Sequence, residues 1–195
     1  MAKKIQKILI IRNDKIGDFT LILPAIASLK KNIPNSKIVC LVSKNVEELA
    51  QQCEFIDEVI VDKKIKDLYL PLKEYKFDMA ISFFSTFRIG YLLKKLNIPL
   101  RLAPKTKLAQ IFYNHKFYQK RSKSKKPEYE YNIDLVYEAF RIMNISDIEE
   151  MSLGPYLTYD YEIVAKNRIN FINEYNLSPD KKIIFLHPGT GGSSK

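Results

Sequence analysis

The stretch at residues 7–32, "KILIIRNDKIGDFTLILPAIASLKKN", contains the clearest structural pattern in the chain. It begins with an aliphatic run, Lys7 to Ile11, that is typical of a buried strand. A polar turn then leads through a single Gly-Asp step into an apolar, periodic run that predicts a helix from Asp18 to Asn32. A buried strand followed directly by a helix is the opening unit of an α/β fold.

The same alternation continues along the chain. Short β-branched runs predict further strands, and amphipathic stretches between them predict helices. The alternation indicates a Rossmann-like parallel sheet with helices on both faces. The later strands are expected at residues 37–42, 58–62 and 77–84, with a short fifth strand beginning at Pro99.

The alternation of predicted strands and helices ends after Pro104. Residues 105–127 show no periodicity and carry many positive charges, which predicts a mobile loop. A helix is expected over 129–144, with Ile133, Val136, Tyr137 and Phe140 on its buried face.

A second domain is expected to begin near the end of the chain. A helix is predicted over 161–176, and the run from Lys182 to Leu186 predicts a strand that opens a Gly-rich loop. A parallel strand needs neighbours to pair with. We therefore expect an acceptor-binding Rossmann-like domain at 1–155, a linker and crossover helix at 156–180, and the first strand and phosphate loop of a truncated domain at 181–195.

Composition narrows the class of protein. The 195 residues are 46% hydrophobic and 28% charged, which is ordinary for a globular protein, and the formal net charge of +10 favours anionic partners. Cys40 and Cys53 are too few for a disulfide framework and are expected to be packing residues. No apolar run is long enough for a signal peptide or a membrane span. We expect a cytoplasmic location, with peripheral contact at the inner face of the cytoplasmic membrane as one option.

Two interpretations of Asp18 stay open at this stage. Aspartate is a preferred helix cap, so Asp18 could simply cap the following helix. Alternatively, it could point into a cleft beyond the first strand, where α/β sheets bind ligands, and act as a general base. Pro24 would remove a backbone hydrogen bond inside the predicted helix, so the first turn should be irregular and Thr20 could be the true cap.

The C-terminal "HPGTGGSSK" predicts an anion-binding loop. Gly189, Gly191 and Gly192 permit backbone N–H groups to face a phosphate, and Lys195 adds a point charge. The spacing does not match a P-loop, and an ordinary strand-to-helix turn is the alternative. His115 and His187 do not form a metal-ligand pattern, and no Asp-x-Asp pair is present, so no metal site is expected.

These motifs together resemble the N-terminus of glycosyltransferase family 9, the ADP-heptose:lipopolysaccharide heptosyltransferases. The resemblance rests first on a basic residue after the strand, a hydrophobic-Gly-Asp step and a Leu-Pro-Ala run. Further matches extend it over essentially the whole chain. The matching residues are Arg12, Ile16-Gly17-Asp18, Leu23-Pro24-Ala25, "FDMAI", Arg101, "EYNIDLV" and "LHPGTGGSSK".

The resemblance implies a two-domain GT-B enzyme that inverts the anomeric carbon, with this chain as its N-terminal half. It implies that Asp18 is the catalytic base and that Gly17, Arg12 and Arg101 contact the acceptor. It also implies a donor-phosphate site formed by Lys195, Thr190, Gly189, Gly191 and Gly192. The donor would be a nucleotide-sugar such as ADP-heptose, the acceptor a lipid-linked oligosaccharide or lipopolysaccharide core, and no cofactor would be needed. We expect the 195-residue piece alone to be inactive.

Two alternatives to an enzyme remain, a nucleic-acid-binding module and a non-catalytic paralogue. The first depends on the basic run within 115–126, with Phe117 and Tyr118 beside it. This run could be a solvated loop, could meet acceptor phosphates, or could bind nucleic acid. No recognition helix supports the last of these, and no nucleic-acid partner is expected. The chain could also be a truncated, non-catalytic paralogue that retains only anion binding.

Overall fold

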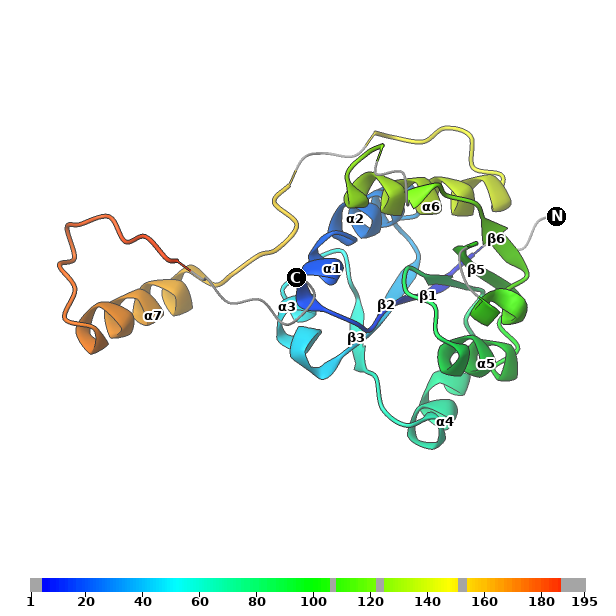
Figure 1. The fold of residues 1–195 in the computed structure, drawn as a ribbon, viewed down its shortest axis with the longest axis horizontal. Helices are drawn as coiled ribbons and strands as arrows, with labels where there is room; N and C mark the ends of the chain where they lie inside the picture. Colours follow the sequence, from blue (N-terminus) through cyan, green and yellow to red (C-terminus); the bar gives the residue numbers. More distant parts are fainter. Residues whose placement is uncertain (1–4, 106–107, 122–124, 151–153, 187–195) are drawn as a thin grey trace. The chain divides into compact units, whose positions relative to one another are not determined.

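The computed structural model of the chain describes residues 5–105, 108–121, 125–150 and 154–186. The chain divides into two compact units, residues 1–158 and residues 159–195 (Figure 1). Each unit is described by itself below.

The first unit is built on a six-stranded sheet in which every pair of neighbouring strands is parallel. The strand order is β3-β2-β1-β4-β5-β6, so β1 lies between β2 and β4. This confirms the predicted α/β class with a parallel sheet. The strands are β1 (Lys7–Arg12), β2 (Lys37–Val42), β3 (Glu58–Val61), β4 (Met79–Ser82), β5 (Leu100–Pro104) and β6 (His115–Phe117).

Helices cover both faces of this sheet. Alternate residues of β1 enter opposite cores: Ile8 and Ile10 face one, and Leu9 and Ile11 face the other. Figure 1 shows α2 and α6 above the sheet and α4 and α5 below it. The helical segments of this unit are α1 (Ile16–Thr20), α2 (Leu23–Asn32), the 3-10 turn η1 (Lys44–Val46), α3 (Glu47–Gln51), α4 (Ile65–Tyr75), α5 (Phe87–Lys95), the 3-10 turn η2 (Leu108–Phe112) and α6 (Glu128–Ile142).

The helix predicted over Asp18–Asn32 is two helices. The chain leaves helical bonding after Thr20 and re-enters it at Leu23, which places Pro24 at the start of α2, where its missing N–H costs nothing. The expected irregularity is confirmed, but both predicted caps are wrong. Lys15 occupies the N-cap position of α1, and the hydroxyl of Thr20 donates to the carbonyl of Gly17 at 2.7 Å.

The segment predicted as a loop over 105–127 contains regular structure. Its described residues include η2 and β6, and the N–H of Lys105 donates to the carbonyl of Phe117 at 2.7 Å. Neither element is long enough to produce a periodic hydrophobic pattern, because η2 has five residues and β6 has three. The prediction of a structureless loop was therefore wrong for these residues.

The helix α6 buries a somewhat different face from the predicted one. Val136 and Phe140 are fully buried, as expected, but Tyr137 is exposed over more than a third of its surface. Asn132 is completely buried instead, and its amide donates to the carbonyl of Leu21 at 2.9 Å. That carbonyl belongs to the break between α1 and α2, so α6 supplies the hydrogen bond that the break leaves open.

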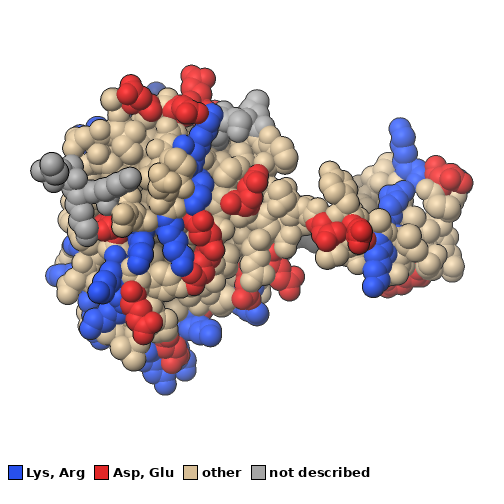
Figure 2. Space-filling view, turned by 180° about the vertical axis from the view of Figure 1, so that it is seen from behind, with Lys and Arg blue, Asp and Glu red and all other residues tan. Residues whose placement is uncertain are grey.

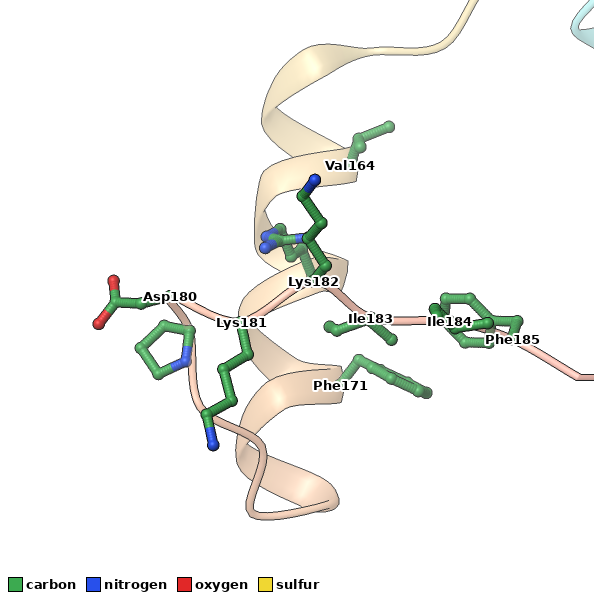
Figure 3. A pocket seen from close by; sticks show the side chains of 10 residues that line it. Val164, Phe171, Asp180, Lys181, Lys182, Ile183, Ile184 and Phe185 are labelled. Atoms are coloured by element: carbon green, nitrogen blue, oxygen red, sulfur yellow. The ribbon is translucent and has the colours of Figure 1, made fainter.

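The second unit contains α7 (Tyr161–Glu174), capped by the Asp160 carboxylate, which accepts from the N–H of Glu162 at 2.8 Å. The predicted strand at Lys182–Leu186 is not formed, since a strand requires a paired neighbour and the described part of this unit provides none. This segment instead runs beside α7 and lines a hollow of about 780 Å³. Figure 3 shows Ile183 lying over Phe171 of α7.

Both cysteines are packing residues, as predicted. Cys40 in β2 and Cys53 after α3 are almost completely buried in one core, and burial raises the pKa of each thiol. Among the described residues, no helix combines the length and the hydropathy needed to cross a membrane.

Gly90 allows a close approach between α5 and η2. A Cβ atom at this position would lie 2.9 Å from Cδ2 of Phe112 and 3.1 Å from the carbonyl oxygen of Ala109. Gly17, also helical, has no atom within 4 Å of such a Cβ. The two glycines therefore have different reasons to be in their helices.

We predict opposite effects for alanine at these two positions. Gly90→Ala should lower the free energy of unfolding by about 1–3 kcal/mol, because η2 must shift away from α5. Gly17→Ala should leave stability unchanged or raise it by about 0.5–1 kcal/mol, because alanine is the better helix former. Urea unfolding of the two variants measures both effects. Equal stability of the two variants would contradict the close packing of η2 on α5.

Candidate functional site

A polar pocket lies at the edge of the sheet formed by the carboxyl ends of the strands, beside the point where the strand order reverses. From β1 the sheet extends through β2 to β3 on one side and through β4 to β6 on the other. Ligands of open α/β folds bind at such a reversal. The pocket has a volume of about 240 Å³, and its lining follows β1, β4, β5 and β6: Arg12, Asp14, Phe83, Phe84, Ser85, Pro104, Arg121 and Glu128.

Arg12 is the centre of this site. It is the last residue of β1, and its guanidinium is almost fully buried. Its Nε lies 2.8 Å from a carboxylate oxygen of Asp14, one Nη lies 2.9 Å from Oδ1 of Asp18, and the other Nη donates to the carbonyl of Phe83 at 3.2 Å. A buried cation is stable only when it is paired in this way. Arg12 therefore fixes the turn after β1 and ties it to the end of β4.

Asp14 is the more buried of the two carboxylates that Arg12 holds. Burial raises its pKa above the ordinary value, the positive charge of Arg12 opposes this shift, and the nearby charge of Asp18 adds to it. The backbone carbonyl of Asp14 also accepts from the hydroxyl of Ser43 at 3.0 Å. Asp14 is thus held in place on both its side chain and its backbone.

A second polar cluster holds the same turn from the other face of the sheet. The Asp62 carboxylate, just after β3, accepts from the amide of Asn13 at 2.6 Å and pairs with Arg88 of α5. The guanidinium of Arg88 also donates to the carbonyl of Lys63 at 2.9 Å. The turn is therefore braced between the ends of β1 and β3 and the start of α5.

Asp18 lies in the first turn of α1, next to the pocket. Its ion pair with Arg12 orients the carboxylate, and its side chain is still 37% exposed, so a substrate can reach it. Gly17 lies directly before it, with open space where a side chain would be. Three of the predicted site residues, Arg12, Gly17 and Asp18, are thus brought together.

Arg101 is not brought to this pocket. It lies near the start of β5, where its Nε donates to the carbonyl of Phe112 at 2.8 Å and another guanidinium nitrogen donates to the carbonyl of Ile98. Partial burial lowers its pKa. In the structure Arg101 therefore holds the backbone between β5 and β6.

Arg121 belongs to the basic run within 115–126, for which the sequence leaves a solvated loop, acceptor contact and nucleic-acid binding open. In the structure it turns inward, lines the pocket and pairs with Glu128 of α6. Its guanidinium also donates to the amide oxygen of Gln119 at 2.9 and 3.0 Å. Burial lowers the pKa of Arg121, the attraction of Glu128 opposes this, and the proximity of Arg12 lowers it further. The pocket lining therefore holds two neighbouring cations, each paired with a carboxylate of the same lining.

Ser85 also lines the pocket. It follows β4 and is 8% exposed. Burial raises the pKa of Tyr113, and side-chain hydrogen bonds with Ser82 and Ser85 oppose this shift. Ser85 is therefore a polar residue of the lining that is tied to Tyr113.

The predicted donor-phosphate loop lies outside the described residues. This concerns Gly189, Thr190, Gly191, Gly192 and Lys195, together with His187. Within the described ranges, no group of three or more His, Cys, Asp or Glu side chains is arranged to hold a metal ion.

Comparison with curated proteins finds a glycosyltransferase relative. The chain is 44% identical over 195 residues to a Haemophilus influenzae protein described as "Putative glycosyltransferase", covering 97% of this chain and 56% of the relative. No family model matches the chain. The chain therefore spans little more than half the length of this relative.

Solved structures share the fold at low sequence identity. Escherichia coli ADP-heptose lps heptosyltransferase II superposes with a TM-score of 0.70 at 19% identity, over 90% of this chain and 52% of that one. A family 9 glycosyltransferase from Veillonella parvula gives 0.72 at 17% identity, over 92% of this chain and 52% of that one. E. coli heptosyltransferase WaaC with ADP-2-deoxy-2-fluoro heptose gives 0.60 at 17% identity, over 85% and 54%.

These likenesses confirm the resemblance to glycosyltransferase family 9 that the motifs indicate. The fold matches one half of the two-domain heptosyltransferases. By its curated relative and its fold, the chain is glycosyltransferase-like.

We predict that Arg12→Met destabilises the fold in a pH-dependent way. The variant leaves Asp14 charged and unpaired, which should lower the free energy of unfolding by about 2–3 kcal/mol at pH 7. The pKa of Asp14 is raised in the folded chain, so this group favours folding below its ordinary pKa and loses that contribution as pH rises through the raised value. The deficit should therefore be smaller at pH 4 than at pH 7.

Lys31→Met is the control, because Lys31 pairs with Glu149 and both side chains are exposed. Its unfolding free energy should stay within about 0.5 kcal/mol of the unsubstituted chain. Thermal or urea unfolding at pH 4 and pH 7 measures how far each of the two variants differs in stability from the unsubstituted chain. An Arg12→Met deficit that is the same at both pH values would contradict the role given to Asp14.

Proposed function

We propose that this chain is the acceptor-binding half of an inverting glycosyltransferase, with Asp18 as the base. The observation that carries the proposal is the ion pair of Asp18 with Arg12, beside a polar pocket at the strand-order reversal. The pair holds an accessible carboxylate in one orientation, which a general base requires. The glycosyltransferase-like relative and fold support the reaction class.

The proposed reaction joins an acceptor hydroxyl to the anomeric carbon of the donor sugar. Asp18 takes the hydroxyl proton as the new oxygen–carbon bond forms. The bond between that carbon and the diphosphate oxygen breaks, its electrons leave with the nucleoside diphosphate, and the configuration inverts. Gly17 leaves open space beside Asp18 for the approach of the acceptor.

We infer an anionic acceptor for the pocket. Arg121 and Arg12 are neighbouring cations in a partly buried site, where Glu128 and Asp14 pair with them. A phosphate or carboxylate of a lipopolysaccharide-type core would make charge-assisted hydrogen bonds with these groups. The basic excess of the chain favours such an acceptor.

The donor is inferred from the C-terminal sequence motif and from the similarity to solved heptosyltransferases. Two of the structural neighbours are WaaC structures with ADP and with ADP-2-deoxy-2-fluoro heptose. We infer a nucleotide-sugar such as ADP-heptose for this protein. Lys195, Thr190 and the neighbouring glycines would bind its diphosphate through a cation and backbone N–H groups.

We predict that Asp18→Asn abolishes transfer while the fold is retained. In the complete protein that carries this chain, kcat for transfer from ADP-heptose to a lipopolysaccharide-core acceptor should fall about 10²–10⁴-fold. Asp67→Asn is the matched control, because Asp67 also lies in the first turn of a helix but at the surface of α4. Undiminished kcat in folded Asp18→Asn would refute the assignment of the base.

We predict that Arg121→Gln weakens acceptor binding selectively. Loss of a charge-assisted hydrogen bond should raise KM for the acceptor at least about tenfold, with a smaller effect on KM for the donor. The exposed neighbour Lys120 provides the control Lys120→Gln, for which both constants should stay unchanged. Equal changes for donor and acceptor in Arg121→Gln would argue against an acceptor subsite in the pocket.

A further inference from the structure

One side of the first unit exposes apolar side chains that form a continuous surface. Phe87 and Tyr91 of α5 both pack their rings against Phe112 of η2, with ring centroids 4.8 and 6.1 Å apart. Leu108 and Ile111 project from η2 itself and are 90% and 66% exposed. We call the exposed side chains of Phe87, Tyr91, Leu108 and Ile111 the α5–η2 patch.

The α5–η2 patch rests on closely packed elements. Gly90 lets η2 approach α5 closely, and Ala109 and Gln110 are the buried side of η2. Leu108 and Ile111 therefore point outward because the other side of their turn is packed. Single exposed apolar residues are ordinary, but a contiguous cluster marks a surface that contacts something apolar.

The chain segment that carries the patch has charges of one sign. No Asp or Glu occurs between Asp78 and Glu128, whereas Lys and Arg recur throughout that stretch. Arg88, next to Phe87, pairs with Asp62. Further exposed cations are Lys94 and Lys95, at the end of α5, and Lys105, just before η2. Lys94 lies one turn beyond Tyr91 on the same helix, so aromatic and basic groups share its outer side. Figure 2 shows Lys and Arg together with Asp and Glu at the lower left of this unit, on the side where α4 and α5 lie.

We infer that the α5–η2 patch docks the protein on an anionic phospholipid bilayer. Leu108, Ile111 and the two aromatic rings would enter the boundary between headgroups and acyl chains, and the lysines would meet the anionic headgroups. Exposed lysines beside an apolar centre fit such a surface, because the headgroup layer is negative and the layer beneath it is apolar.

The place of the patch also fits the proposed function, on which this step rests. Phe87 begins α5 only two residues after Ser85, which lines the pocket, and Lys105 follows Pro104, which also lines it. The patch and the pocket thus begin at the same edge of the sheet. A lipid-linked acceptor held in a bilayer would present its sugar to the pocket while the patch contacts the membrane.

Vesicle binding of the complete protein tests this inference directly. The probe is a flotation assay with phosphatidylcholine vesicles containing phosphatidylglycerol, compared with vesicles of phosphatidylcholine alone. We expect binding only to the anionic vesicles and release by salt. The double variant Leu108→Ser/Ile111→Ser should weaken binding at least about tenfold. Lys94→Gln should weaken it about fivefold.

The control is Tyr129→Ser/Tyr137→Ser, which removes two exposed aromatic side chains from α6 on the opposite side of the sheet. It should bind vesicles as the unsubstituted protein does. Equal binding by the Leu108/Ile111 variant and by this control would overturn the inference. So would a dimer of the unsubstituted protein that Leu108→Ser/Ile111→Ser dissociates, because the patch would then be an interface between copies.

Activity on a deacylated, water-soluble acceptor separates the two proposals. The Leu108/Ile111 variant should transfer to the soluble acceptor normally and lose rate only on acceptor in vesicles. Transfer without vesicle binding by the unsubstituted protein would refute the membrane surface and leave the proposed function standing. Vesicle binding without any transfer would refute the proposed function and leave the membrane surface standing.

Discussion

The arrangement of the site depends on the buried guanidinium of Arg12. A cation at the end of a central strand, enclosed by the helices of an α/β fold, is tolerated only if its charge is paired. Arg12 forms ion pairs with Asp14 and Asp18 and donates to the carbonyl of Phe83. Because these partners come from the turn, from α1 and from the end of β4, one side chain fixes the geometry of three elements. The accessible carboxylate of Asp18 is therefore positioned by the same interaction that stabilises the turn.

The break between α1 and α2 serves the same arrangement. A continuous helix through Pro24 would lose a hydrogen bond and clash with the preceding turn. Ending α1 at Thr20 avoids this cost but leaves backbone groups unpaired, and Asn132 of α6 binds the carbonyl of Leu21. The same Asn132 side chain accepts from Arg121 at 3.3 Å. Hydrogen bonds thus connect the broken helix, α6 and the second cation of the pocket.

The sequence predicted what depends on periodicity and missed what depends on long-range contact. The buried strands and the parallel sheet followed from alternating apolar runs, and the irregular helix start followed from Pro24. The elements η2 and β6 were missed because they are short and are held by pairing with β5 and packing on α5. Arg121 was not distinguished from its basic neighbours for a related reason: the run left several roles open, and only the fold brings Arg121 to Arg12. The Arg101 motif, in contrast, lies in β5 with its side chain bound to nearby carbonyls.

The two helical glycines, Gly17 and Gly90, each carry a stability cost, but the structure explains that cost at only one of them. Glycine in a helix is less favourable than alanine by about 0.5–1 kcal/mol, so each needs a compensating reason. At Gly90 the reason is visible, because a side chain would collide with Phe112. At Gly17 there is open space, and the structure itself gains nothing from the missing side chain. Open space directly before a carboxylate held by Arg12 supports the proposal that a molecule comes close to Gly17.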